Sequence, residues 1–388
     1  MAADQFGAAL AVSGDVLVTS APSAVADGKQ YAGTAYVFLR DLTTTAWTEQ
    51  KKLLPQDGAD FDQFGTVVAV DGETVVIGAP NAAVNGAFQQ GAVYIFGRQQ
   101  GGTDNWGQVA KLTDDTVGLG GHFGSALAIK GDLLVVGASE ASARHGRVTI
   151  FDRNRGGADA WGAVTTVSYT TVGDGNNVVS FGTGVALDGD LLLIGAARTS
   201  VSYWNEADGA AYLFRRNAGD ADRWDFVTRL ITPGADRCVG GLTLTEAISL
   251  SAEFLAEAQR CATEDSKTSN DNFGNAVALA GDIIVVGARF AEGVNATFSN
   301  GAAYVFQRDA VVPDRWTFIA KLALADTSAF AFFGTALALA DNTIVVGAPG
   351  AAIGDKTGQG AAYVFKRDTG GVGSWGRGRE AAGERWPE

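Results

Sequence analysis

An arginine recurs at an equivalent position in six segments of this chain, two residues after a phenylalanine that closes an apolar run. Six guanidinium groups at equivalent positions could bind an anion. We expect each one instead to pair with a neighbouring carboxylate or to stack on a tryptophan, since a guanidinium does both readily. The six arginines are Arg40, Arg98, Arg153, Arg216, Arg308 and Arg367. Seven or eight residues after each stands a tryptophan that we expect in the core: Trp47, Trp106, Trp161, Trp224, Trp316 and Trp375.

The motifs of the common catalytic sites do not occur in this sequence. It has no G-x-S-x-G elbow, no H-E-x-x-H pair and no phosphate-binding loop. Carboxylates are numerous, but they fall mainly in turns and in linkers such as Asp60-Phe61-Asp62, where they commonly bond to the backbone of the turn. A carboxylate pair acting on a glycosidic bond stays open as an alternative. No cofactor is expected.

Aromatic and acidic side chains gather in two segments outside the repeated apolar runs. Because aromatic rings bury large areas at low entropic cost and stack on sugars, we predict a binding surface there. Its residues are Tyr203, Trp204, Glu206, Asp208 and Phe298.

Three residues are candidates for covalent links. Cys238 and Cys261 both lie in a segment that lacks the repeated pattern, residues 231–271. They either form a disulfide, which would be worth about 3 kcal/mol for a loop of this length, or lie buried as two small side chains. The two histidines are far from them in sequence, so we expect no metal site. Asn295, in the sequon Asn-Ala-Thr, is a glycosylation candidate, and a glycan there would shield part of the predicted surface.

One pattern repeats along the whole chain and must position these residues. Phe-Gly opens each copy, and the copies follow one another at 58 to 60 residues, except for one interval of 92 that contains residues 231–271. A period of this size predicts a solenoid, a propeller or an array. The six phenylalanines are Phe6, Phe64, Phe123, Phe181, Phe273 and Phe333.

Each copy has the composition of four short strands. In the second copy, two apolar runs separated by Asp71-Gly72 predict a hairpin with a type I′ turn. A third apolar run follows at 92–96, and Trp106 opens a fourth strand. Four strands per unit, rich in β-branched and aromatic residues, favour a propeller blade over a helical solenoid. We predict an all-β fold, a single β-propeller over residues 1–388, with six blades that begin near residues 4, 62, 121, 179, 271 and 331.

Two segments depart from the pattern. Thr243 and Glu246 form a capping box before an apolar stripe that runs to Ala258, so residues 231–271 are predicted to hold one short helix between the fourth and fifth repeats. We expect this insertion to pack on the propeller, or alternatively to bind a partner. The last copy, Trp375-Gly376-Arg377, lacks the apolar residues that follow the other tryptophans. A truncated seven-bladed propeller is therefore the alternative to six blades.

The repeats resemble a known family. Phe-Gly, a period near 60, and Gly-Ala-Pro after the second strand, as in 78–80 and 347–349, are similar to the FG-GAP repeats of the integrin α-subunit propeller. The resemblance covers nearly the whole chain except about residues 231–271, and it implies cell adhesion, outside the cell or on its surface. Integrins carry Ca²⁺ loops of the form DxDxDG between their first two strands. Here tight turns stand at that place and cannot supply the six to eight oxygen ligands that Ca²⁺ takes, so no metal is expected.

Composition limits the partners. A net charge of −14 repels phosphate groups, which argues against nucleic acid and anionic membranes as partners. No run approaches 18 consecutive apolar residues, so no segment is expected to insert in a membrane. The chain shows no signal peptide, because the first Phe-Gly follows Met1 within five residues. Either the natural start differs or the protein is not secreted.

Chain direction predicts where a ligand binds. In a four-stranded meander, the loops between second and third strands share one face with the linkers between blades. These loops are long and carry large aromatics, including Tyr31 and Phe88, which favours recognition on that face; the alternative is that the rings only plug the mouth of the propeller. We therefore expect a non-enzymatic recognition or adhesion module that binds protein or glycan. The alternative is an enzyme acting on polysaccharide, with carboxylates at the mouth of the channel.

Overall fold

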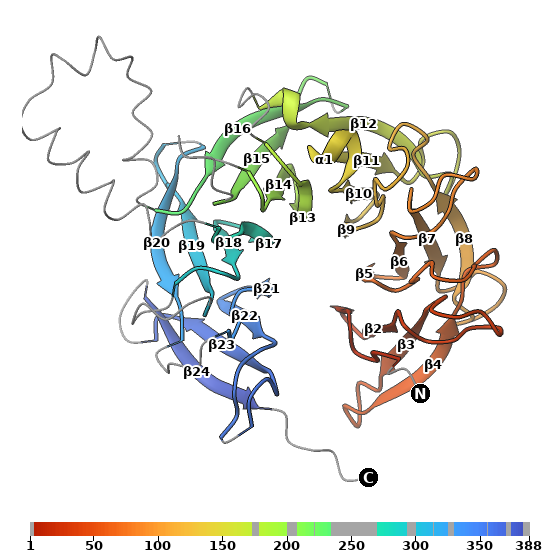
Figure 1. Ribbon diagram of the computed structural model, residues 1–388, viewed down its shortest axis with the longest axis horizontal. Coiled ribbons are helices and arrows are strands. Elements are labelled where there is room, and N and C mark those ends of the chain that lie inside the picture. The colour runs from red at the N-terminus through yellow and green to blue at the C-terminus, as the bar shows by residue number, and fades with distance from the viewer. Residues whose placement is uncertain are drawn as a thin grey trace, which may run out of the picture. The chain divides into compact units, whose positions relative to one another are not determined.

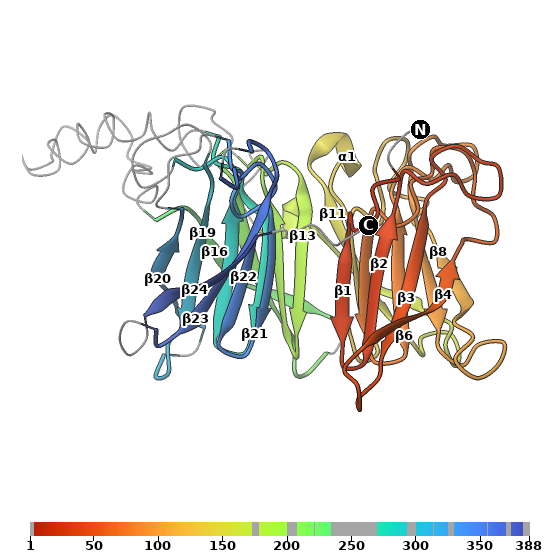
Figure 2. The ribbon, with the colours of Figure 1, turned by 90° about the horizontal axis from the view of Figure 1, so that it is seen from below.

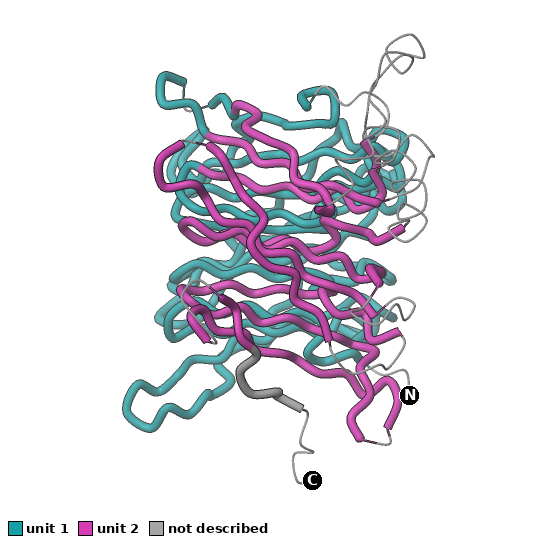
Figure 3. Tube along the Cα trace, turned by 90° about the vertical axis from the view of Figure 1, so that its left-hand side faces the viewer, with its two compact units in different colours: residues 1–176, 180–190, 216–224 teal, residues 177–179, 191–215, 225–388 magenta. Residues whose placement is uncertain are grey.

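The computed structural model describes residues 4–172, 178–199, 208–220, 222–233, 270–292, 300–312, 314–324, 330–354, 356–369 and 374–382. Its contacts divide the chain into two compact units, which we describe separately (Figure 3). Unit 1 comprises residues 1–176, 180–190 and 216–224, and unit 2 comprises residues 177–179, 191–215 and 225–388. The predicted helix in residues 231–271 lies outside the described residues, as do Cys238 and Cys261.

The described strands form six sheets, each of four antiparallel strands in chain order, so the fold is the predicted six-bladed β-propeller (Figure 1). The first three blades contain β1 (Leu10–Ser13), β2 (Val16–Ala21), β3 (Thr34–Arg40) and β4 (Trp47–Leu53); β5 (Val67–Asp71), β6 (Thr74–Ala79), β7 (Ala92–Gly97) and β8 (Gly107–Leu112); β9 (Ala126–Lys130), β10 (Leu133–Ala138), β11 (Arg147–Asp152) and β12 (Gly162–Ser168). The last three contain β13 (Phe181–Asp188), β14 (Leu191–Ala196), β15 (Ala210–Arg216) and β16 (Trp224–Leu230); β17 (Phe273–Ala280), β18 (Ile283–Ala288), β19 (Ala302–Arg308) and β20 (Trp316–Leu322); β21 (Ala336–Ala340), β22 (Thr343–Ala348), β23 (Ala361–Arg367) and β24 (Trp375–Ala382).

The hairpin between the first and second strands closes one residue later than the sequence suggested. In blade 2, Asp71 pairs with Thr74, so the two loop residues are Gly72 and Glu73. Positive φ is confined to the first of them, Gly72 at 54°. A type I′ turn needs positive φ at both loop residues, whereas type II′ needs it at the first. The predicted type I′ turn is therefore wrong here, and the pattern is that of type II′.

The second strand of most blades is buried along its whole length. Every residue of β6, β10, β14 and β18 is buried, which explains why these strands are continuous apolar runs without alternation. Blades of one unit pack face to face through such strands. Val18 and Val37 of blade 1, for example, join Ile77 and Trp106 of blade 2 in one hydrophobic cluster.

The Phe-Gly and Gly-Ala-Pro motifs meet where one blade packs on the next. A Cβ atom added to Gly78 would lie 2.2 Å from the carbonyl oxygen of Gly124, which belongs to the Phe-Gly of the following blade. No side chain fits between two backbones this close, so glycine is required at this contact. The same contact joins Gly137 to Gly182, Gly195 to Gly274 and Gly287 to Gly334.

Helical structure is nearly absent from the described part of the chain. It consists of the four-residue turn α1 (Ala141–Arg144) and a 3₁₀ turn at Tyr169–Thr171. No helix among these residues has the length and apolar character needed to cross a bilayer.

Candidate functional site

Two kinds of segment lie at one end of each blade. The 2–3 loop joins the second and third strands, and the linker joins the fourth strand to the next blade; together they form what we call the loop face. In unit 1 it includes the 2–3 loops 22–33, 80–91 and 139–146 and the linkers 54–66 and 113–125. In Figure 2 the α1 turn marks the loop face of blade 3, and the short hairpin turns lie at the opposite end of the strands.

Each linker is bonded to the 2–3 loop of the preceding blade. The backbone N–H groups of His122 and Phe123 donate to the carbonyls of Gln89 and Gln90, at 3.1 and 2.8 Å. The loop ends on Gly91, where an added Cβ would lie 2.2 Å from the Phe123 carbonyl oxygen. We call this contact the seam. The seam positions the loops and linkers of the loop face relative to one another, because backbone hydrogen bonds join each loop to its linker.

The 2–3 loop of blade 3 is shorter than those of blades 1 and 2. Residues 139–146 number eight, whereas residues 22–33 and 80–91 number twelve each. The longer loops contain a small hairpin whose tip is Asp27-Gly28 or Asn85-Gly86, and all four tip residues have positive φ. That is the type I′ pattern, for which Asp-Gly and Asn-Gly are the preferred sequences. Blade 3 lacks this hairpin.

A hollow of about 750 Å³ lies beside the short loop. Its walls come from the linker of blade 3 (116–122), from the short loop (139–144) and from Gln89 of the preceding loop. All three belong to unit 1. The missing hairpin leaves this space open, so the site follows from a loop length rather than from a recognisable motif. The volume is within the range of about 300–1,000 Å³ that is usual for ligand sites.

The hollow is lined mainly by polar groups. Glu140 and Arg144 form an ion pair of 3.8 Å, and the Arg144 side chain is 74% exposed. Ser139, Ser142 and His122 add two hydroxyl groups and an imidazole. The site therefore offers an anion, a cation and neutral donors and acceptors within one cavity, which suits recognition of a polar ligand.

The short loop closes through an unusual backbone. Ser142, Ala143 and Arg144 have φ values of 54°, 59° and 76°, so three successive residues other than glycine are left-handed. Each costs about 1–2 kcal/mol relative to the right-handed region. Strain of this kind concentrates at functional sites, where the surrounding structure holds it in place. The side chains of Ser142 and Arg144, on this segment, are both exposed.

The binding surface predicted from sequence lies mostly outside the described residues. Tyr203, Trp204 and Glu206 fall in 200–207, and Phe298 and Asn295 fall in 293–299. Of that set, Asp208 is described, and it is buried rather than presented to solvent, with 3% exposure. Its carbonyl accepts the N–H of Phe273 at 2.8 Å, so Asp208 belongs to the seam between blades 4 and 5.

A second buried carboxyl stands close to Asp208. Asp271 is also 3% exposed. Burial raises the pKa of Asp271 to about 8; the charge of Lys321 opposes this effect, and those of Asp208 and Glu292 add to it. The Lys321 ammonium lies 5.5 Å from the centre of the Tyr304 ring and donates to the Glu292 carbonyl at 3.1 Å. A protonated carboxyl of this kind has the chemistry of a general acid.

Blade 2 carries a similar cluster, which indicates a structural role. Asp62, like Asp271, stands two residues before the Phe of Phe-Gly and is buried, and burial raises its pKa. Its carboxylate accepts the N–H of Ala59 at 2.8 Å. Lys111 binds the nearby Asp57 at 2.5 Å and lies 5.4 Å from the ring of Tyr94, as Lys321 does with Tyr304. Such clusters anchor the linker to its own blade.

The expected pairing is seen for Arg98, Arg153, Arg308 and Arg367. Arg98 binds Asp104 at 2.5 Å and Asp15 of the preceding blade at 3.4 Å. Arg153 binds Asp132 and Asp159, and it also stacks 4.8 Å from the Trp161 ring. Arg308 pairs with Asp314, and Arg367 pairs with Asp282 of the preceding blade.

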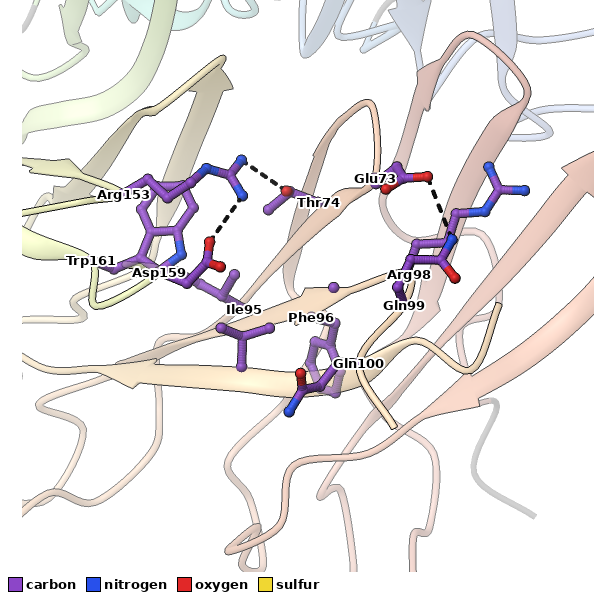
Figure 4. A pocket seen from close by; sticks show the side chains of 12 residues that line it. Glu73, Thr74, Ile95, Phe96, Arg98, Gln99, Gln100, Arg153, Asp159 and Trp161 are labelled. Carbon is purple, nitrogen blue, oxygen red and sulfur yellow. Dashed lines mark hydrogen bonds and ion pairs between the residues drawn. The ribbon is translucent and has the colours of Figure 1, made fainter. Parts of the chain in front are cut away.

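Two of these arginines, Arg98 and Arg153, line a smaller pocket of about 240 Å³ at the end of the strands opposite the loop face (Figure 4). Figure 4 shows Arg153 directed toward Asp159 and Thr74, with Trp161 beside it. Because its guanidinium groups are already neutralised by carboxylates, this pocket is a poor anion site. The expected pairing of Arg98 and Arg153 with carboxylates, and the stacking of Arg153 on a tryptophan, are confirmed.

The tryptophans follow the prediction in four blades. Trp106, Trp161, Trp224 and Trp375 are buried. Trp47 is 39% exposed, so core packing is wrong for that residue. Trp161 shares a hydrophobic cluster with Ile95 of the preceding blade, and unit 1 contains no blade before the first that could cover Trp47 in the same way.

The residues of the hollow were missed by sequence reasoning. His122, Glu140 and Arg144 belong to no motif, and two of them lie in a loop that carries no large aromatic. The signal that could have revealed them is the length of the third 2–3 loop, which is four residues shorter than in repeats 1 and 2.

Comparison with known proteins agrees with this architecture. The FG-GAP repeat family matches six segments: residues 1–38, 47–96, 106–151, 166–214, 262–306 and 316–365. No curated protein matches the chain. Among solved structures, a putative 6-phosphogluconolactonase from Bacteroides fragilis has 10% identity and a TM-score of 0.52, over 96% of this chain and 82% of that one. The periplasmic gluconolactonase of Pseudomonas aeruginosa has 13% identity and a TM-score of 0.55, over 96% of this chain and 85% of that one.

At these identities the two structures share the fold alone. The six family matches cover most of the chain, and each contains the first two strands of one blade and runs into its third. The chain belongs to the FG-GAP repeat family.

Proposed function

We propose that this FG-GAP propeller is a non-enzymatic recognition module that binds glycan or protein through its loop face. The observation that carries the proposal is the hollow beside the short loop of blade 3, with Glu140 and Arg144 in its wall. It is open, polar and built on loops that the seam holds rigidly. Rigid loops bind with a smaller loss of conformational entropy, which favours recognition.

An enzyme acting on polysaccharide is the second candidate, and one observation favours it. Asp271 and Asp208 place a protonated carboxyl next to a second carboxyl, as glycoside hydrolysis requires. Both side chains are only 3% exposed, however, so a sugar could not reach them without opening the seam between blades 4 and 5. In blade 2, Asp62 stands at the equivalent position before Phe-Gly and belongs to a similar buried cluster. This similarity supports a structural role for Asp271 and Asp208.

A parallel screen of the purified protein distinguishes the two candidate functions. One arm measures binding to arrays of glycans and of extracellular proteins. The other measures turnover of glycoside hydrolase, polysaccharide lyase and sugar lactone substrates, the last because of the lactonase structures with the same fold. Stable binding without turnover is expected. Turnover of any substrate without a stable binder would contradict the proposal.

We further propose that the protein acts outside the cell or on its surface. The support is its resemblance to the propellers of integrin α-subunits, which are cell-surface receptors. Fractionation of the producing cells, followed by detection with an antibody, checks this location. Recovery in the cytoplasmic fraction alone would contradict it.

A further inference from the structure

We infer that the hollow beside the short loop of blade 3 binds an uncharged sugar unit, with Glu140 and Arg144 holding neighbouring hydroxyl groups. This inference rests on the proposed function and names its ligand. The first argument is shape. An open hollow of about 750 Å³ lined by three segments has room for a small unit, such as one or two sugar rings, whereas a protein partner would need a wider surface.

The second argument is charge. Glu140 and Arg144 carry opposite charges and stand 3.8 Å apart, so together they leave the wall close to neutral. Asp114 and Asp115 lie in the adjoining linker, and the chain as a whole carries a charge of −14. An anionic ligand such as a sulfated or uronic-acid glycan would be repelled by these surroundings. A cationic ligand would face the exposed Arg144 guanidinium.

The third argument is hydrogen bonding. Each hydroxyl of a sugar both donates and accepts, so a sugar site needs acceptors and donors side by side. The Glu140 carboxylate is an acceptor, and the Arg144 guanidinium is a donor with its N–H groups in a fixed plane. Ser142 and the Gln89 side chain add groups that do both. This mixture matches a row of hydroxyls better than it matches a purely anionic or apolar ligand.

The fourth argument is an apolar patch at the rim. Leu119 belongs to the wall and is 74% exposed, and Phe88 is 59% exposed. Gly120 donates its N–H to the Phe88 carbonyl at 3.0 Å, which brings the linker that carries Leu119 alongside Phe88. The C–H face of a sugar ring packs on apolar and aromatic groups of this kind. The polar groups of the wall would therefore bind the hydroxyl groups of a sugar, and the apolar groups at the rim would pack on its C–H face.

The left-handed backbone adds preorganisation. Because residues 142–144 have a sparsely populated backbone conformation, the backbone that carries Arg144 already has its shape before the ligand arrives. A site that is rigid before binding loses less entropy on binding.

The test is a glycan array with neutral, uronic-acid and sulfated oligosaccharides of one to four residues, followed by calorimetric titration of the strongest neutral binder. Variants Glu140→Gln and Arg144→Ala are compared with wild type. Arg40→Ala is the matched control, since Arg40 is also an exposed arginine but stands at the opposite end of the strands. All four proteins are first checked for the same melting temperature.

We expect at least tenfold weaker binding of the neutral sugar to each of the two hollow variants and unchanged binding to Arg40→Ala. Binding only to acidic glycans, or neutral binding that both hollow variants keep, would overturn the inference while leaving the recognition function in place. Absence of any glycan binder together with a protein binder would also overturn it. Turnover of a substrate without stable binding of any glycan or protein would instead overturn the proposed function itself.

Discussion

Replacement of Gly91 by alanine is the perturbation that most directly probes how the loop face is built. Gly91 has φ of +92°, and an added Cβ would lie 2.2 Å from the carbonyl oxygen and 2.5 Å from the nitrogen of Phe123. Gly86, five residues earlier in the same loop, has φ of +81° and nothing within 4 Å of such a Cβ. The pair Gly91→Ala and Gly86→Ala therefore separates the contact across the seam from backbone strain alone.

The expected magnitudes follow from these distances. Alanine at positive φ costs about 1–2 kcal/mol, and this applies to both variants. Gly91→Ala must also push the linker away by about 1 Å, to reach ordinary contact, and this breaks the 2.8 Å bond from Phe123 to Gln90. Loss of that bond costs about 1 kcal/mol, and partial exposure of the buried Phe123 ring costs about 1–2 kcal/mol more. We expect about 1–2 kcal/mol for Gly86→Ala and about 3–5 kcal/mol for Gly91→Ala.

Urea unfolding followed by far-ultraviolet circular dichroism measures both changes. Tryptophan fluorescence in parallel reports on the buried rings of Trp106 and Trp161. The reasoning would be refuted if the two variants unfolded at the same urea concentration. It would also be refuted if Gly86→Ala were the less stable of the two.

Three further predictions concern ionic groups and metal. Asp271 has a folded pKa of about 8 against 3.8 for the free group, so the native state holds its proton more tightly between these values. Its contribution to stability is then full below about pH 4 and is lost as pH rises to 8, by up to about 1.4 kcal/mol per pH unit. Asp271→Asn should flatten the fall in unfolding free energy between pH 5 and pH 8, and an unchanged slope would contradict this. Arg98→Ala should cost about 1 kcal/mol, because its partners Asp15 and Asp104 are partly exposed, and the cost should shrink in 1 M salt; a cost that persists in salt would point to packing instead. Finally, the two-residue turns and the lack of any cluster of three metal-binding side chains among the described residues predict that a chelator leaves the melting temperature unchanged, whereas a large drop would reveal a metal site.

The repeat was predictable from sequence because its chemistry is local. Phe-Gly and Gly-Ala-Pro need glycine where two backbones touch, as at Gly78 and Gly124, and such a requirement recurs with every blade. The turn type was not predictable, because Asp71-Gly72 favours type I′ by itself whereas the register Asp71–Thr74 places glycine first in the loop.

The candidate site was less predictable, since it depends on what is missing. The third 2–3 loop is four residues shorter than the first two, which leaves the space of the hollow open. The linker beside that loop supplies the remaining lining residues. The role of Asp208 also depended on tertiary contacts. Its carbonyl joins the seam through Phe273, which no pattern around residue 208 could indicate.

Hydrogen–deuterium exchange with the strongest ligand from the arrays tests the central claim most directly. If the loop face is the recognition surface, bound ligand should slow exchange in residues 116–122 and 139–146, and mass spectrometry should recover the ligand unchanged. The hairpin turns at the opposite end of the strands, including Gly72 and Gly131, should exchange as before. Slowed exchange confined to those turns, or recovery of a cleaved or otherwise converted ligand, would contradict the account.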